Sequence, residues 1–179
     1  MMSICLLRAV NVGGRQVKMD QLRTMADELG FEDAKTLLAS GNLVLDAGAM
    51  GSDKLSATLE AEFQKRFGFH AEFICRTAKE WRVLMDGCPF RKDAETRGNR
   101  LLCLVSQGSP AKDVVATLEA LADAGERVAR HGDDVWIAFT DEGMARSKLA
   151  SAKAMKAFGC PVTGRNWNTV EKLGALAQA

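Results

Sequence analysis

The sequence has 179 residues, of which 47% are hydrophobic and 26% are charged, and its formal net charge at pH 7 is +1. This composition indicates a globular chain of one or two domains and excludes disordered and fibrous proteins. The small net charge excludes a uniformly polycationic nucleic-acid binder. Because no apolar run approaches the roughly 18 residues of a membrane span, we expect no membrane partner.

Residues 1–77 carry the hydrophobic periodicity of a βαββαβ unit. A helical period follows Met19 and ends at Gly30, and a second follows Ser52 and ends at Gly68. We expect this segment to form a first ferredoxin-like half. Short apolar runs predict its strands at residues 4–10, 36–39, 43–46 and 72–76.

Residues 78–98 are expected to connect two halves. Thr77 and Glu80 have the spacing of a capping box, which predicts a helix that ends at Gly87. Residues 88–98 contain a proline and several charged residues, and this composition predicts a linker.

Residues 99–179 repeat the same order and are expected to form a second ferredoxin-like half with a C-terminal helix. Ser109 and Pro110 predict the start of one helix, and the last helix is expected to begin after Asn166 or Asn168. A further helix is predicted at residues 144–158. Strands are predicted at residues 100–106, 127–130 and 135–140, with a short edge strand at 161–163.

The sequence therefore predicts an α+β fold of two ferredoxin-like βαββαβ-type halves packed together, with extra connecting and C-terminal helices. The strand runs at residues 4–7 and 101–105 are apolar on both faces. A lone ferredoxin-like sheet covers only one face with helices, so the second face must also be covered. The other half, the extra helices or a second chain are the three alternatives, and we expect a monomer or a homodimer.

The number of cysteines is odd, and no two have Cys-x-x-Cys spacing. We expect all five to be free thiols of a cytoplasmic protein. Cys88 and Cys160, each before a proline, lie in predicted loops, where a thiol can be exposed. The two histidines, His70 and His131, lie far apart in the sequence with no cysteine at ligand spacing, so we expect no metal site. No motif indicates a cofactor.

Distinctive short segments occur at residues 7–14, 17–31, 40–42, 146–149 and 165–170. Together they resemble the domain-of-unknown-function family 1697, a bacterial family. The resemblance implies a two-part α+β fold and brings no established activity, substrate or catalytic residue. The chain departs from the usual pattern at Ala9 and Val10, where Gly-Ile is more typical, and it has no tyrosine.

Charge is unevenly distributed along the second half. Residues 113–142 contain eight acidic side chains against two arginines, whereas residues 143–179 contain six basic side chains against one glutamate. The simplest interpretation is a solvated basic helix with its acidic neighbour folded against it.

Lys148 falls on the apolar arc of the predicted helix at about 100° per residue. A lysine there must snorkel, find a partner or face a polar pocket.

Cationic and amide side chains gather in two polar loops and at two predicted helix starts. The turn at residues 11–15 lacks the dinucleotide fingerprint and the P-loop motif, and a turn that needs positive φ explains it equally well. If the fold brings these segments together, they form a cationic, amide-rich cleft. The predicted ligand-binding residues are Arg8, Asn11, Gly13, Gly14, Arg15, Lys18, Ser40, Asn42, Arg146, Ser147, Lys148, Arg165, Asn166 and Asn168.

Three functions are compatible with the sequence, and the first is favoured. The first is binding of an anionic ligand, either a nucleotide, a phosphorylated metabolite or nucleic acid, although the central strands lack the aromatics with which sheet-face RNA readers stack bases. The second is an enzyme in which Lys148 and Arg165 stabilise charge, but no catalytic residue can be named. The third is a self-associating scaffold.

Overall fold

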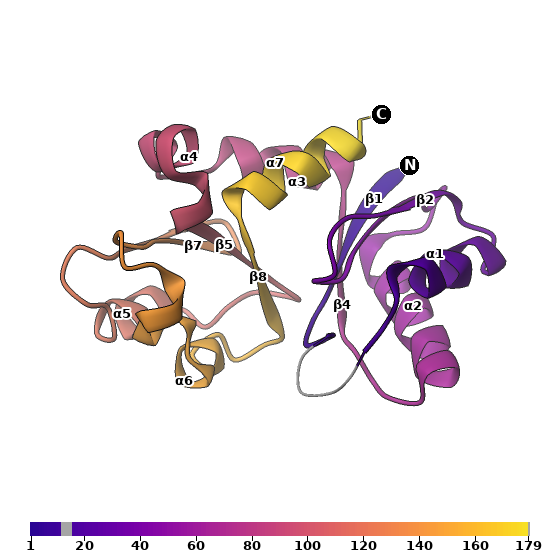
Figure 1. Ribbon diagram of the computed structural model, residues 1–179, viewed down its shortest axis with the longest axis horizontal. Helices are drawn as coiled ribbons and strands as arrows, with labels where there is room; N and C mark the ends of the chain where they lie inside the picture. Colours follow the sequence, from indigo (N-terminus) through magenta and orange to yellow (C-terminus); the bar gives the residue numbers. More distant parts are fainter. Residues whose placement is uncertain (12–15, 179) are drawn as a thin grey trace. The chain divides into compact units, whose positions relative to one another are not determined.

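The computed structural model describes residues 1–11 and 16–178. The chain divides into two compact units, which are Met1–Arg82 with Lys172–Ala179 (unit 1) and Val83–Glu171 (unit 2). Each unit contains one four-stranded antiparallel sheet with helices packed against it (Figure 1). The α+β prediction is therefore confirmed.

Unit 1 follows the order βαββαβ. Its sheet has the strand order β2-β3-β1-β4, with every neighbouring pair antiparallel, which is the ferredoxin-like arrangement. Because α1 and α2 connect strands that are not neighbours, both return across the same face of the sheet (Figure 1). The elements are β1 (Met2–Leu7), α1 (Met19–Glu28), β2 (Glu32–Thr36), β3 (Asn42–Asp46), α2 (Ser52–Phe67) and β4 (Phe73–Thr77).

The core of unit 1 explains why these helices form. Helix α1 buries Leu22, Met25 and Ala26, which recur at helical spacing, against the strands. Helix α2 buries a second stripe that includes Phe63, and Gly68 ends the helix in the left-handed conformation with φ of 76°. Sequence periodicity alone therefore predicts both helices and the faces that they bury.

Unit 2 repeats the order with a second ferredoxin-like sheet, β6-β7-β5-β8. Strand β8 pairs with β5 and extends past the predicted residues 161–163 to Asn166, so it completes the βαββαβ pattern. The elements are α3 (Ala78–Asp86), which begins in unit 1, α4 (Arg91–Arg97), η1 (Gly98–Arg100), β5 (Leu101–Ser106), α5 (Val114–Glu119), β6 (Arg127–His131), β7 (Asp134–Ala138), η2 (Met144–Arg146), η3 (Lys148–Ala150), α6 (Ala152–Lys156), β8 (Val162–Asn166) and α7 (Trp167–Leu176), which ends in unit 1.

The single helix predicted at residues 144–158 is wrong. The segment forms the two short 3₁₀ turns η2 and η3, followed by the short helix α6. Ser147 accepts a hydrogen bond from the backbone N–H of Leu149 at 3.0 Å, and Ser151 accepts one from Ala154 at 3.2 Å. These local bonds restart the helix twice, because a serine hydroxyl competes with the helical backbone ladder.

Three other segments differ from their predictions. Strand β2 lies at Glu32–Thr36 and not at the predicted residues 36–39, which leaves residues 37–41 as a loop. The helix predicted to start at Ser109 and Pro110 begins at Val114, and the Ser109 hydroxyl instead donates to Asp133 at 3.3 Å. Residues 88–98, predicted as a linker, contain helix α4. The buried carboxylate of Asp93 on α4 pairs with Arg127 of β6 at 2.6 Å, so α4 is fixed within unit 2.

The strands predicted to be apolar on both faces are buried along their length. Ile4 and Leu6 of β1 have no exposed surface, although their neighbours Cys5 and Leu7 belong to the helix-facing core. Leu101 and Cys103 of β5 are equally buried. No helix among the described residues is long and apolar enough to cross a membrane.

Candidate functional site

Two loops of unit 1 lie side by side at the end of the sheet where β1 stops. They are the described part of the loop after β1 (residues 8–11 and 16–18) and the loop between β2 and β3 (residues 37–41), and we call them the paired loops. The backbone N–H of Leu7 donates to the Gly41 carbonyl at 2.8 Å. The fold therefore brings together two of the polar loops that the sequence singled out.

Asn11 fastens the paired loops to each other. Its amide nitrogen donates to the Ala39 carbonyl at 2.5 Å and to the Val17 carbonyl at 3.2 Å. Its side-chain oxygen accepts from the backbone N–H of Val17 at 2.7 Å. Asn11 was predicted to contact a ligand, and these three bonds give its amide a structural role.

The backbone of the paired loops is strained. Ala9, Asn11 and Leu38 have φ values of 56°, 56° and 60°, a region that costs a residue with a side chain about 1–3 kcal/mol. Gly41 also has positive φ, and a Cβ atom there would lie 2.6 Å from Val10 Cγ2. Strain of this kind collects at binding and catalytic sites because the surrounding structure must enforce it.

The paired loops carry exposed positive charge. Lys18 is exposed and has no ion-pair partner within residues 1–11 and 16–178. Arg8 is 39% exposed at its side chain and pairs with Glu72 at 2.9 Å. Ser40 is exposed and its hydroxyl accepts from the Asn42 amide at 3.0 Å, whereas Asn42 is fully buried and also donates to the Leu37 carbonyl at 2.6 Å. Arg8, Lys18 and Ser40 can therefore reach a ligand, and Asn42 shapes the turn.

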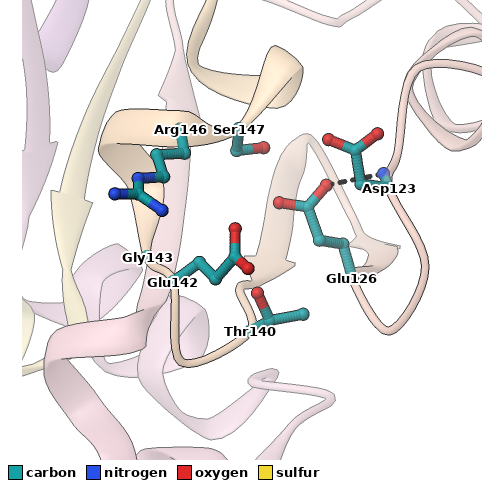
Figure 2. A pocket seen from close by; sticks show the side chains of 7 residues that line it. All are labelled: Asp123, Glu126, Thr140, Glu142, Gly143, Arg146 and Ser147. Atoms are coloured by element: carbon teal, nitrogen blue, oxygen red, sulfur yellow. Dashed lines mark hydrogen bonds between the residues drawn. The ribbon is translucent and has the colours of Figure 1, made fainter.

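The second set of predicted residues belongs to unit 2, and part of it lines a small acidic pocket of about 30 Å³, enough for roughly two water molecules. Figure 2 shows carboxylates of Asp123, Glu126 and Glu142 around this space, with Arg146 and Ser147 at its edge. Even with the Lys148 ammonium group paired to Asp123, three carboxylates outnumber the nearby cations and disfavour an anion here.

Lys148 does not lie on an apolar inner face as predicted, because the continuous helix that would place it there does not form. Its side chain is 66% exposed and its ammonium group pairs with Asp123 at 2.8 Å. This hydrogen bond and the charge of Asp123 raise the pKa of Lys148. The lysine has found a partner, which was one of the three alternatives, and the basic segment contacts the acidic one.

The residues around β8 and α7 hold the fold together. Arg165 is 7% exposed and donates to Thr163 Oγ1 at 2.9 Å and to the Gly164 carbonyl at 2.8 Å, and burial lowers its pKa to about 10. Asn166 caps α7 by accepting from the Thr169 backbone and hydroxyl, both at 3.0 Å. Asn168 does not cap the helix. Its side-chain oxygen lies close to Gly98, where an added Cβ atom would be only 2.1 Å from it.

Trp167 is a packing residue. Its ring is 5% exposed and lies 5.7 Å from that of Trp136, centroid to centroid, also within unit 2. Gly13, Gly14 and Arg15 lie outside the described residues. The remaining predicted residues fall in two different units, and the proposal that they share one cleft stays a prediction.

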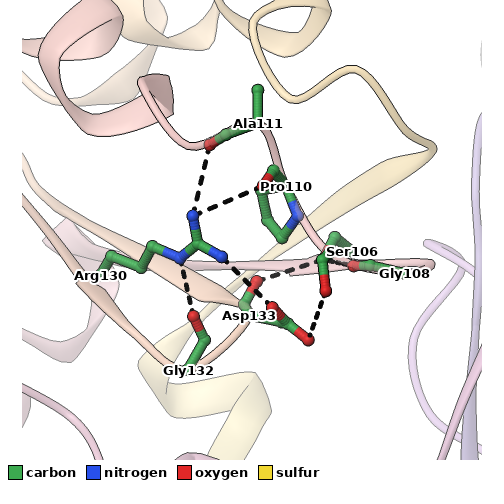
Figure 3. A network of polar contacts seen from close by, with 8 residues as sticks. Ser106, Gly108, Pro110, Ala111, Arg130, Gly132 and Asp133 are labelled. Carbon is green, nitrogen blue, oxygen red and sulfur yellow. Dashed lines mark hydrogen bonds and ion pairs between the residues drawn. The ribbon is translucent and has the colours of Figure 1, made fainter.

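Unit 2 contains a polar network that the sequence does not predict. Figure 3 shows Arg130 at its centre, donating to the carbonyl of Gly132 at 2.7 Å and pairing with Asp133 at 3.2 Å. Ser106 donates to the carbonyls of Gly108 and Asp133 at 2.7 and 3.1 Å. The network fastens the loop after β5 to the β6–β7 turn, and no short motif signals it.

No group of three or more His, Cys, Asp or Glu side chains in the part of the chain that the structure describes is placed to hold a metal ion.

Comparison with known proteins identifies the family of this chain and a solved structure with a similar fold. A model of a family described as "Protein of unknown function (DUF1697)" matches residues 1–136. The chain is similar to a solved structure of the conserved bacterial protein SP0830 from Streptococcus pneumoniae, with 23% identity, 98% of each chain covered and a TM-score of 0.78. At this identity the likeness shows the fold alone. No curated protein matches the chain.

Proposed function

The chain belongs to the DUF1697 family of proteins of unknown function, and we propose that this member binds a phosphate-bearing ligand at the paired loops of unit 1. The nucleotide, the phosphorylated metabolite and the nucleic acid share the phosphate as their recognised group. The observation that carries the proposal is the strained backbone of Ala9 and Leu38, in loops that also carry the partly exposed Arg8 and the exposed Lys18.

The chemistry of the two cations supports a phosphate. A guanidinium presents paired N–H donors that match phosphate oxygens, and an ammonium group adds a mobile charge. Arg8 is already oriented by Glu72 at 2.9 Å, so an incoming anion meets a pre-positioned donor and less side-chain entropy is lost on binding. The Ser40 hydroxyl adds a neutral donor at the same end of the sheet.

Calorimetric titration of the full chain tests the proposal. Pyrophosphate, ATP and a twelve-nucleotide single-stranded RNA serve as separate probes, which distinguish a small anion from a polymer. We expect binding of at least one probe that weakens as salt is added, since phosphate contacts release counterions. Absence of binding by all three probes at low salt contradicts the proposal.

Charge reversal locates the site. Lys18→Glu is expected to weaken binding about tenfold or more, because a charge-assisted hydrogen bond contributes roughly 1.5–3 kcal/mol. The matched control is Lys54→Glu, an exposed residue of α2 in the same unit. Lys54 follows the end of β3 where Asp46 pairs with Met2, opposite to the paired loops. Equal loss of affinity in both variants contradicts a site at the paired loops.

A further inference from the structure

Two cysteine side chains face each other across the central and edge strands of unit 1. Cys5 of β1 and Cys75 of β4 are register partners, and their sulfur atoms lie 2.7 Å apart. Opposed residues of an antiparallel pair have Cβ atoms about 4.5–5.5 Å apart, which approaches the roughly 3.5–4.5 Å of a disulfide. A bond between these sulfurs therefore requires only a small movement of each side chain.

We propose that Cys5 and Cys75 form a cross-strand disulfide when the protein meets a peroxide, so that this pair is a site of reversible oxidative modification. The bond would covalently join strands that are 70 positions apart in the sequence and would fix β4 to the sheet. This inference is independent of the phosphate proposal.

Burial protects the pair while the strands are closed. Cys5 is 0% and Cys75 is 2% exposed, and both belong to the helix-facing core. Burial, together with the neighbouring Cys75 thiol, raises the pKa of the Cys5 thiol well above its ordinary value. Because the thiolate is the form that reacts with peroxide, the closed pair reacts slowly.

The position of β4 provides the access route. In the order β2-β3-β1-β4, strand β4 lies at the edge of the sheet, whereas β1 lies inside it. Edge strands open locally without unfolding of the whole domain, and opening of β4 would uncover Cys75 first. Cys75 is therefore assigned as the thiol that meets the oxidant and Cys5 as the thiol that resolves it.

The reaction balances with one peroxide molecule. The Cys75 thiolate attacks one oxygen of hydrogen peroxide, the O–O bond breaks, and hydroxide leaves to give a sulfenic acid. The Cys5 sulfur then attacks the Cys75 sulfur, the S–O bond breaks, and the hydroxyl group leaves as water. Two thiols are oxidised by two electrons and one peroxide is reduced to two water molecules. A dithiol reductant reverses the modification.

Mass spectrometry of the oxidised full chain tests the proposal. After peroxide treatment of the folded protein, we expect the number of thiols that react in denaturant to fall from five to three. A proteolytic digest is expected to contain one linked pair of peptides, carrying Cys5 and Cys75, which dithiothreitol separates. Retention of all five thiols, a linkage that involves another cysteine, or a linkage between chains overturns the proposal.

Matched variants separate this pair from general oxidation. Cys75→Ser is expected to abolish the linkage and leave the other four cysteines unlinked. Cys103→Ser removes an equally buried cysteine from unit 2 and is expected to form the Cys5–Cys75 linkage as the natural chain does. If Cys75→Ser does not fold, the peptide map of the natural chain decides the question on its own.

Discussion

Gly41 illustrates how a single residue sets the approach of the paired loops. A Cβ atom there would lie 2.6 Å from Val10 Cγ2 and 2.8 Å from Leu7 Cβ, at a φ of +79°. The residue types at positions 40–42 predict a turn. The sequence contains no signal for the neighbour that lies against it.

We predict that Gly41→Ala destabilises the protein by about 3 kcal/mol, because left-handed strain and overpacking add. Gly30→Ala is the matched control, since Gly30 has a φ of +82° and open space where its Cβ would be. It is expected to lose only about 1 kcal/mol. Urea denaturation measures both, and equal losses would show that the contact with Val10 and Leu7 contributes nothing.

Asn11 carries the connection between the paired loops through three hydrogen bonds. Asn11→Gly retains access to positive φ and removes these bonds, so we predict a loss of about 1–3 kcal/mol. Chemical denaturation checks this value. A stability equal to that of the natural chain would mean that the loops are held together without the asparagine.

Ala9, Leu38 and Asn42 show what could not be predicted at this scale. Positive φ at alanine or leucine has no sequence signature, because neither residue favours that conformation. Asn11 and Asn42 were predicted to bind a ligand because of their amide groups. In the fold, the same groups satisfy backbone donors and acceptors. Polarity identifies residues that need partners and does not distinguish a ligand from a carbonyl of the chain itself.

At the scale of elements, the start of α3 follows the sequence closely. The backbone N–H of Thr77 donates to the Glu80 carboxylate at 2.7 Å, and the backbone N–H of Glu80 donates to the Thr77 hydroxyl at 3.2 Å. The predicted capping box is confirmed. We expect Thr77→Ala to cost about 1 kcal/mol and Thr77→Ser to cost much less. Thermal denaturation followed by circular dichroism compares the two, and equal effects would contradict a capping role.

The same capping box predicts a pH effect. Burial favours the neutral form of Glu80, but hydrogen bonds from Thr77 and Ser52 outweigh it and lower the pKa of this carboxyl below its ordinary value. The stabilisation is therefore complete above the unfolded-state pKa and is lost as pH falls through the lower folded-state pKa.

We predict that the free energy of unfolding of Glu80→Gln decreases less between about pH 5 and pH 3 than that of the natural chain, because glutamine does not titrate. Urea unfolding across this range measures the difference. Parallel decreases in the two proteins would contradict the pKa shift.

The segment 144–158 shows why an element can be missed. Its apolar residues recur at helical spacing, and the helix was predicted from that period alone. Ser147 and Ser151 instead bond to nearby backbone N–H groups and start new turns. Periodicity reports which residues become buried, and local side-chain bonds decide whether the backbone stays continuous.

At the scale of the whole molecule, the double βαββαβ order could be predicted because most of its strands and helices carry a hydrophobic period. Strand β2 has no such period, and it was predicted too late in the sequence. Strand β8 was underestimated, since Arg165 and Asn166 do not have strand composition and are held there by pairing with β5. The candidate site was predicted only in part. The uneven distribution of charge along the chain favoured Lys148 as a ligand-binding residue. In the fold, Lys148 pairs with Asp123.

The measurement that tests the central claim most directly is a titration of the isotopically labelled full chain with pyrophosphate, followed by amide NMR signals. Binding at the paired loops predicts that the largest shifts occur at Arg8, Ala9, Lys18, Ser40 and Gly41, and that added salt diminishes them. Unchanged spectra at saturating pyrophosphate, or shifts confined to residues outside these loops, would contradict it.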